Sequence, residues 1–107
     1  MCVFCQIINK EIPTQPVYED ANVLVIEDLH PQAPIHWLMI PKIHVESFSQ
    51  AAPDVILACA LGIQNLLKDK GIMQYRIVTN TGADGGQTVP HLHFHILAGR
   101  ALGWPPG

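Results

Sequence analysis

The chain has 107 residues, of which 49% are hydrophobic and 14% charged, and its net charge is −3 with histidine neutral. This length and composition predict one globular domain over residues 1–107 and exclude a disordered protein. The six lysines and arginines are scattered, so no basic patch indicates a nucleic-acid partner. No apolar run is long enough to cross a membrane, and no basic segment precedes a long apolar one. We therefore expect a cytoplasmic protein without a membrane partner.

Local sequence patterns predict two helices and five strands. Phe4, Ile7 and Ile8 follow helical spacing and indicate a short helix. Pro53 suits the first position of a long helix, and Gly71 suits the residue after its end. The predicted order is helix 3–9, strands 17–18, 23–27 and 35–40, helix 53–70, strands 75–79 and 91–97, and a tail over 99–107. The fold class is therefore α+β, with a mostly antiparallel five-stranded sheet and one long and one short helix.

The predicted last strand alternates imidazole and large apolar side chains, in the order His91-Leu92-His93-Phe94-His95. Because side chains alternate across a strand, the histidines are expected on one face, about 6.6 Å apart from one to the next. Structural histidines and a zinc site made of several imidazoles remain as alternatives. Three histidines in register opposite an apolar face favour a catalytic arrangement.

A glycine-rich segment, Asn80 to Thr88, lies directly before these histidines. Its free backbone N–H groups can converge on an anion, and Asn80, Gln87 and Thr88 add neutral donors. Imidazole is a competent nucleophile and is largely neutral at pH 7. The loop and the histidines together predict a site in which neutral donors hold a phosphate while a histidine attacks it.

The segment from His91 to Leu97 resembles the His-x-His-x-His-x-x motif, with x apolar, of the histidine triad family. The resemblance covers nearly the whole chain. The terminal Trp104-Pro105-Pro106-Gly107 is similar to the Hint branch, the histidine triad nucleotide-binding proteins. The other matching segments are Ile7-Ile8, Glu11-Ile12-Pro13, Pro31 to His36, Ile40-Pro41-Lys42 with His44, Tyr75-Arg76, Asn80, Asp84 to Gln87 and Gly99-Arg100.

The resemblance implies a HIT-like fold and a homodimer. It further implies that the protein binds purine nucleoside monophosphates (AMP or GMP) and hydrolyses phosphoramidates and acyl-adenylates. His93 takes the place of the family's nucleophile. His91 and His95 take the places that orient it and contact the phosphate, and His36 falls on the family's supporting fourth histidine.

The resemblance also implies a nucleotide pocket. Asp28 falls on the acid that binds the ribose hydroxyls. The positions of the apolar base pocket are Phe4, Ile7, Ile12 and Leu38, and those of the phosphate and leaving-group contacts are Asn80, Gly86, Gln87 and Thr88. The residues alone leave an alternative for each position. Asp28 could be a turn acid, and the four apolar residues could be ordinary core side chains. His36 and His44 could be surface histidines.

Two features depart from the Hint pattern. Pro90 lacks an N–H and biases its neighbour toward extended geometry, so the start of the last strand is expected to differ. Cys2-x-x-Cys5 is a pair with which other histidine triad proteins bind zinc. The corresponding set is Cys2, Cys5, His44 and His91, a complete tetrahedral and therefore structural zinc site. Two reduced cysteines are the alternative, and no metal is expected in the chemistry itself.

We therefore predict a purine nucleoside 5′-phosphoramidate hydrolase that forms a covalent nucleotidyl-histidine at His93. The alternatives are a dinucleoside polyphosphate hydrolase and a non-catalytic nucleotide-binding scaffold. Nucleotidyl transferases of the family carry Gln where this chain has His95. His95 and Thr88 are both candidates for protonating the leaving amine. We expect the dimer interface on helix 53–70 and the strand before it, with Trp104 reaching the partner's active site.

Overall fold

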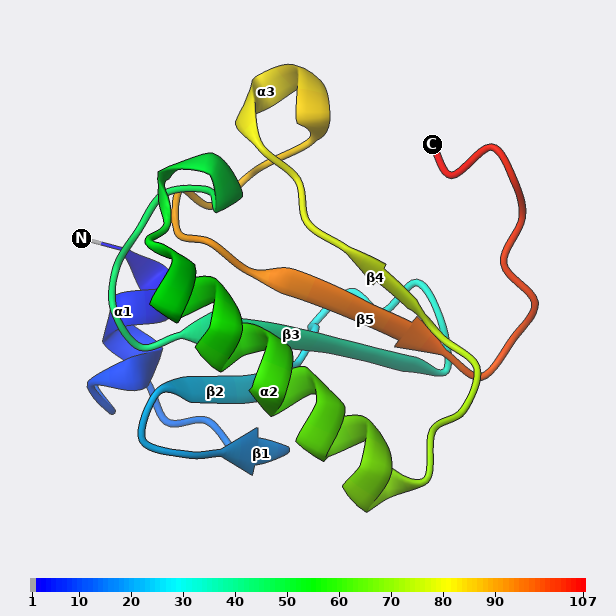
Figure 1. The fold of residues 1–107 in the computed structure, drawn as a ribbon, viewed down its shortest axis with the longest axis horizontal. Coiled ribbons are helices and arrows are strands. Elements are labelled where there is room, and N and C mark those ends of the chain that lie inside the picture. The colour runs from blue at the N-terminus through cyan, green and yellow to red at the C-terminus, as the bar shows by residue number, and fades with distance from the viewer. Residues whose placement is uncertain (1) are drawn as a thin grey trace.

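The structure is a computed structural model that describes residues 2–107, and its centre is a five-stranded antiparallel sheet (Figure 1). The elements are α1 (Val3–Ile8), β1 (Tyr18–Glu19), β2 (Val23–Glu27), β3 (Ile35–Pro41), a 3-10 turn (Phe48–Gln50), α2 (Pro53–Lys70), β4 (Arg76–Val78), α3 (Gly82–Gly85) and β5 (Phe94–Ala98). The strand order is β1-β2-β3-β5-β4, and every neighbouring pair is antiparallel. The predicted α+β fold with one long and one short helix is confirmed, with α3 added as a single turn.

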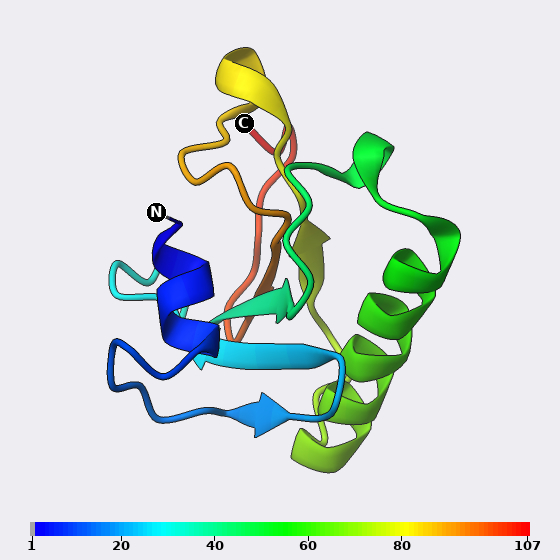
Figure 2. The same ribbon diagram turned by 90° about the vertical axis from the view of Figure 1, so that its left-hand side faces the viewer.

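Helices α1 and α2 lie on opposite faces of the sheet, which explains why the inner strands are apolar on both faces (Figure 2). Residues of β2 and β3 alternate between two core clusters. The cluster under α2 contains Val23, Val25, Trp37, Met39, Cys59, Ile63, Leu66, Leu67, Leu92, Phe94 and Ile96. The cluster under α1 contains Phe4, Leu24, Ile26, Leu38 and Ile40. The two helices thus divide the core into two clusters. The buried side chains of His36 and His93 lie on the α1 side of the sheet, beside the smaller cluster.

Helix α2 has the limits that its terminal residues predict. Pro53 occupies the first turn, and Gly71 ends the helix in the left-handed region with φ of 66°. Gly62 lowers the helix propensity but is needed for packing. A Cβ at this position would lie 2.8 Å from Val23 Cγ2 and 2.9 Å from Met39 Cε. The absence of a side chain therefore lets α2 approach β2 and β3 closely.

The last strand is shorter than predicted. It begins at Phe94 rather than at His91, because the residues before it bond elsewhere. The Leu92 amide donates to the Val45 carbonyl at 2.7 Å, and the His91 amide donates to the Val89 carbonyl at 2.8 Å. Pro90 had predicted an altered start to this strand. Of the triad histidines, only the third lies within a strand, so the regular strand spacing predicted for all three was wrong.

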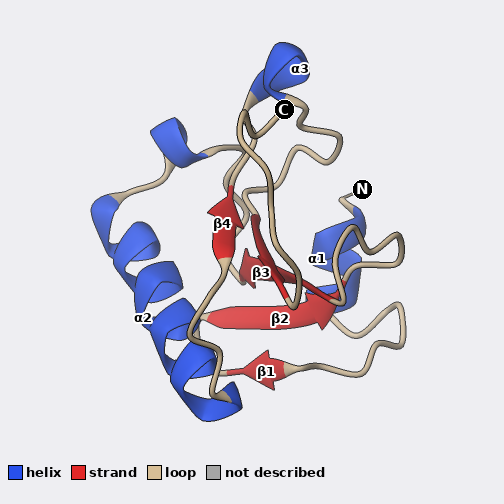
Figure 3. Ribbon diagram, turned by 90° about the vertical axis from the view of Figure 1, so that its right-hand side faces the viewer, coloured by secondary structure: helices blue, strands red, loops and turns tan. Residues whose placement is uncertain are grey.

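The other predicted elements are present with each limit shifted by at most one residue. The tail after β5 has no helix or strand, and its end lies on the same side of the molecule as α3 (Figure 3). Among residues 2–107, no helix is both long enough and apolar enough to span a membrane.

Candidate functional site

His93 lies just before β5, and its side chain is almost fully buried. Its Nδ1 is 2.7 Å from the backbone carbonyl oxygen of His91. A carbonyl oxygen can only accept, so Nδ1 carries the proton and Nε2 keeps its lone pair. The Thr79 hydroxyl donates to the His93 carbonyl at 2.8 Å, and the Phe4 ring packs edge-on with centroids 5.0 Å apart. These contacts fix His93 in the tautomer that a nucleophile requires.

His95 lies beside His93 and contacts the next strand. Its Nδ1 is 2.9 Å from Nε2 of His36 on β3, and the rings of His93 and His95 are 5.1 Å apart. Burial lowers the pKa of His95, and the neighbouring His93 and His36 lower it further, while Asp28 opposes the shift. His95 is therefore neutral at pH 7. The third triad histidine acts as a neutral ring paired with His36.

The Asp28 carboxylate makes a turn contact and also reaches the histidine group. Its Oδ1 accepts a hydrogen bond from the His30 amide at 2.7 Å, which is a turn contact. Its Oδ2 lies 3.3 Å from His36 Nε2 and 4.0 Å from His95 Nδ1. The carboxylate is therefore held by a turn at the edge of the histidine group.

His91 points into a different group, made with two thiols and His44. Its Nδ1 lies 3.4 Å from Cys2 Sγ, 3.6 Å from Cys5 Sγ and 3.1 Å from His44 Nδ1. Cys5 Sγ lies 3.3 Å from His44 Nδ1. All four ligand atoms are within 4.8 Å of one another. The structure thus brings together the four residues that the sequence assigned to a metal.

The geometry and protonation of this Cys2/Cys5/His44/His91 cluster fit a zinc ion. Zn–S and Zn–N bonds of about 2.3 and 2.0 Å place tetrahedral ligands roughly 3.3–3.8 Å apart, close to the observed separations. His91 Nε2 is 2.9 Å from the Pro41 carbonyl oxygen, so it carries the proton and leaves the Nδ1 lone pair facing the thiols. Burial also lowers the pKa of His91, which keeps the ring neutral as a ligand must be.

The Gln87 side chain is used within the glycine-rich loop. Its Nε2 donates to the carbonyl oxygens of Glu46 at 2.6 Å and Val89 at 3.1 Å, and its Oε1 accepts from the Gly82 amide at 3.0 Å. Gln87 therefore ties α3 to the segment before the triad. In this structure its observed contacts shape the loop rather than leave the amide free for a ligand.

The other predicted loop residues surround Gln87. Gly86 adopts φ of +90°, a conformation that favours glycine, and faces the half-buried Asn80 side chain. Thr88 is exposed. The Thr88 side chain is therefore open to a ligand, whereas the Asn80 side chain is partly covered.

The predicted base pocket is only partly a cavity. Phe4 and Leu38 are buried in the core beneath α1, whereas Ile7 and Ile12 line a hollow of about 310 Å³. Leu29, which directly follows Asp28, is 90% exposed and does not line this hollow.

Comparison with known proteins assigns the chain to a family. The HIT domain matches residues 9–102. This chain belongs to the HIT domain family. A HIT-like protein of Synechocystis is 46% identical over 98% of this chain and 96% of its own length. The crystal structure of a HIT family hydrolase from Legionella pneumophila superposes with a TM-score of 0.92 at 40% identity, covering 100% of both chains. The structure of a hypothetical histidine triad nucleotide-binding protein from Sulfolobus tokodaii superposes with a TM-score of 0.80 at 35% identity, covering 90% of this chain and 67% of that one.

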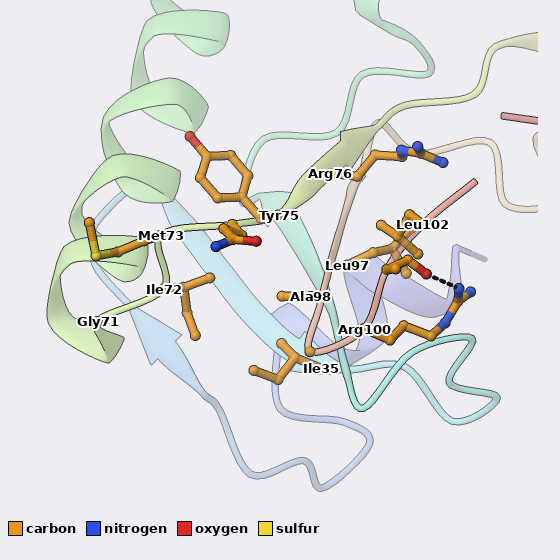
Figure 4. Close-up of a pocket in the computed structure, with 13 residues that line it drawn as sticks. Ile35, Gly71, Ile72, Met73, Tyr75, Arg76, Leu97, Ala98, Arg100 and Leu102 are labelled. Carbon is orange, nitrogen blue, oxygen red and sulfur yellow. Dashed lines mark hydrogen bonds between the residues drawn. The ribbon is translucent and has the colours of Figure 1, made fainter. Parts of the chain in front are cut away.

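A wide hollow of this HIT protein lies away from the triad. It measures about 780 Å³ and lies between the α2–β4 connection and the start of the tail, over residues 71–76 and 97–102 (Figure 4). A hollow of about 210 Å³ lies beside Asp28 and His36. We place the candidate site at the histidine group beside the smaller hollow, because Asp28 and His36 line that hollow and contact His95, whereas no histidine or carboxylate lines the larger one.

Proposed function

We propose that this HIT protein hydrolyses purine nucleoside 5′-phosphoramidates. The observation that carries the proposal is the hydrogen bond from His93 Nδ1 to the His91 carbonyl oxygen, which leaves Nε2 as a free lone pair. His95, whose ring lies beside His93 and whose pKa burial lowers, supplies a neutral donor for an anion next to it. The relatives described as a hydrolase and as a nucleotide-binding protein support the same reaction class.

The proposed reaction has two displacement steps. His93 Nε2 bonds to the α-phosphorus, the P–N bond to the amine breaks, and the leaving nitrogen takes up a proton and departs. Water then attacks phosphorus, the P–N bond to His93 breaks, and the nucleoside monophosphate and a proton are released. In the intermediate the His93 ring is positively charged, so its Nδ1–H bond to the His91 carbonyl becomes charge-assisted. This bond strengthens as the reaction proceeds, which is the requirement for catalysis.

A substrate panel tests this proposal. We expect an adenosine 5′-phosphoramidate with a fluorogenic amine to be cleaved at least an order of magnitude faster, in kcat/KM, than a diadenosine polyphosphate. The reason is that the site offers one neutral nucleophile and no cluster of carboxylates for a magnesium–polyphosphate. Faster polyphosphate cleavage would instead favour the dinucleoside polyphosphate hydrolase, and nucleotide binding without turnover would favour the scaffold.

The Asp28→Asn variant in the same panel tests the ribose contact. Loss of a charge-assisted hydrogen bond costs about 1.5–3 kcal/mol. The variant should therefore bind ribonucleotide substrates more weakly than the wild type does, with a smaller loss of affinity for 2′-deoxyribonucleotides. Equal losses for the two sugars would instead assign Asp28 to its contacts with His30 and His36.

We also propose that the Cys2/Cys5/His44/His91 cluster holds a structural zinc ion. The argument is the donor set described above, two thiols and two imidazoles at tetrahedral separations. All four positions are protein ligands, so no position stays open for substrate. When bound, the zinc would fix α1 and the His91 backbone, whose carbonyl holds the nucleophile.

We infer a homodimer that uses α2 and the sheet edge at β4. The strand before α2 is β3, which is paired on both sides by β2 and β5, so we place the sheet edge of this interface at β4 instead. β4 is one of the two edge strands, the other being β1. The exposed apolar side chains near β4 and on α2 are Phe48, Leu57, Leu61, Tyr75 and Ile77. Exposed apolar side chains next to an unpaired strand edge are typical of an interface between copies.

Light scattering at micromolar concentration should therefore give twice the mass of the chain. Trp104 is 82% exposed, so we expect a second subunit to cover it. Deleting residues 103–107 should leave the dimer but change the preference among leaving amines. A monomer would contradict the interface, whereas an unchanged amine preference would contradict only the role of the tail.

A further inference from the structure

The turn after β5 is clamped to the loop before β3. Arg100 donates from Nε at 3.1 Å and from Nη2 at 2.9 Å to the Gln32 carbonyl oxygen. It also donates from Nη1 at 2.9 Å to the Ala101 carbonyl, the dashed line in Figure 4. Gly99 has φ of +96°, and a Cβ there would lie 2.9 Å from Pro34 Cβ. The close packing at Gly99 and the double hydrogen bond of Arg100 hold the Gln32 backbone in place.

The amide group of Gln32 contacts the histidine group, while its carbonyl binds Arg100. The Gln32 amide N–H donates to His36 Nδ1 at 3.0 Å. A backbone amide can only donate, so Nδ1 carries the lone pair and the proton of His36 is on Nε2. His36 is buried, so few waters are available to replace this amide. The backbone of the loop therefore sets the tautomer of His36.

The tautomer of His36 in turn sets that of His95. The Nε2–H of His36 is 2.9 Å from His95 Nδ1 and 3.3 Å from Asp28 Oδ2, so the shorter contact makes His95 Nδ1 an acceptor. The proton of the neutral His95 ring is then on Nε2. Nε2 of His95 therefore carries a proton and offers a ligand a hydrogen-bond donor, whereas Nε2 of His93 carries a lone pair.

The same protons argue against a metal ion at this place. Oxygen and nitrogen atoms of Asp28, His36 and His95 lie as close together as metal ligands do. However, His36 Nε2 carries a proton because the Gln32 amide occupies Nδ1, so it has no lone pair to offer. The three residues form a hydrogen-bonded chain.

We propose that Arg100 is a positioning residue that, through the Gln32 backbone, fixes the Nε2–H tautomers of His36 and His95. His95 thereby presents a hydrogen-bond donor to the reacting phosphate and cannot act as a second nucleophile. Only this last consequence rests on the proposed hydrolase function. The tautomers themselves are a property of the protein without substrate.

Nitrogen-15 NMR of the histidine side chains at pH 7.5 tests the assignment directly. In the wild type, Nδ1 of His36 and of His95 should give the signal of an unprotonated ring nitrogen and Nε2 that of a protonated one. In Arg100→Met, which keeps the aliphatic stem but removes the donors, both rings should move to mixed tautomers. Arg100→Lys retains one donor and should return the signals part of the way to the wild type.

Two substitutions of Gln32 separate the backbone from the side chain. Gln32→Pro removes the amide hydrogen and should change the tautomers as Arg100→Met does. Gln32→Ala removes only the exposed side chain, which donates to the His30 carbonyl at 3.0 Å, and should keep the wild-type tautomers. Wild-type signals in Arg100→Met or Gln32→Pro, or the opposite tautomers in the wild type, would overturn the proposal.

Kinetics with the phosphoramidate provide the second readout. Arg100→Met should lower kcat roughly ten- to a hundred-fold, as loss of a supporting contact does at other sites, with KM nearly unchanged because the groups that touch substrate remain. A raised KM with an unchanged kcat would contradict the positioning role of Arg100. If the wild type cleaves no phosphoramidate but the tautomers respond as described, the hydrolase proposal fails while the assignment of Arg100 stands.

Discussion

Replacing His93 with alanine is expected to abolish turnover while nucleotide binding survives. The substitution removes the only triad imidazole whose Nε2 lone pair is left free by a backbone carbonyl. The neighbouring His95 cannot replace it, because its free nitrogen is expected to carry a proton. Removing a nucleophile typically costs several orders of magnitude in kcat. Binding should persist because Asp28, the glycine-rich loop and the apolar side chains are unchanged.

The measurement is a steady-state assay of His93→Ala combined with calorimetric titration of AMP. Acid-quenched wild type should show a mass increase of one nucleotidyl group, which His93→Ala should lack. His30→Ala is the matched control, because only the backbone of His30 contacts the site and its side chain is exposed. Near wild-type hydrolysis by His93→Ala, or an adduct on it, would assign the nucleophile to another residue.

The elements of the fold were accessible from sequence where one local rule decided them. Helix α2 begins at Pro53 and is followed by Gly71, as predicted, because the fixed φ of proline and the positive φ of glycine act within one or two residues. The start of β5 was not accessible. It depends on the Leu92 amide bonding to Val45, a partner 47 positions away that no local pattern indicates.

The chemistry of the site was predicted by residue type but not by orientation. The sequence placed three histidines on one strand face, whereas His91 faces the thiols and His95 pairs with His36. The direction of each ring follows from a backbone group. Carbonyls hold His91 and His93, and the Gln32 amide holds His36. Every residue has these groups, so the sequence cannot indicate which ones reach an imidazole.

Backbone control of tautomers links the two halves of the site. The Pro41 carbonyl binds the Nε2 proton of His91, so the lone pair of His91 faces the cysteines. The carbonyl of His91 itself binds the Nδ1 proton of His93, so the lone pair of His93 is on Nε2, the atom proposed to attack phosphorus. A displacement of the His91 backbone would therefore change a metal ligand and the nucleophile together. Phe4 extends this link, because its ring contacts both His91 and His93 at centroid separations of 5.8 and 5.0 Å.

Removing the bound zinc is accordingly expected to lower both stability and activity. Helix α1 has six residues, too few to be stable alone, and carries Cys5 while Cys2 directly precedes it. Without a cation, burial and the neighbouring Cys2 thiol raise the pKa of Cys5, so the Cys5 thiol stays protonated at neutral pH. Zinc reverses this preference by binding thiolates. Structural zinc in small peptides contributes about 10–16 kcal/mol, and the separate core under α2 reduces the share that folding depends on here.

We expect one zinc per chain by elemental analysis and a fall in Tm on the order of 10 °C or more after chelation, since each kcal/mol shifts Tm by about 4–8 °C in a domain of this size. Cys5→Ser should lose the zinc and reproduce the lower Tm. Cys59→Ser is the matched control. Cys59 is a residue of α2, its thiol is buried in the core, and burial raises its pKa to about 11. Loss of this thiol should leave the zinc content unchanged. The kcat of the chelated protein should also fall, because α1 and the His91 carbonyl would no longer hold His93. Equal zinc content in the two cysteine variants, or a Tm that chelation does not move, would show that the cysteines are only a reduced pair.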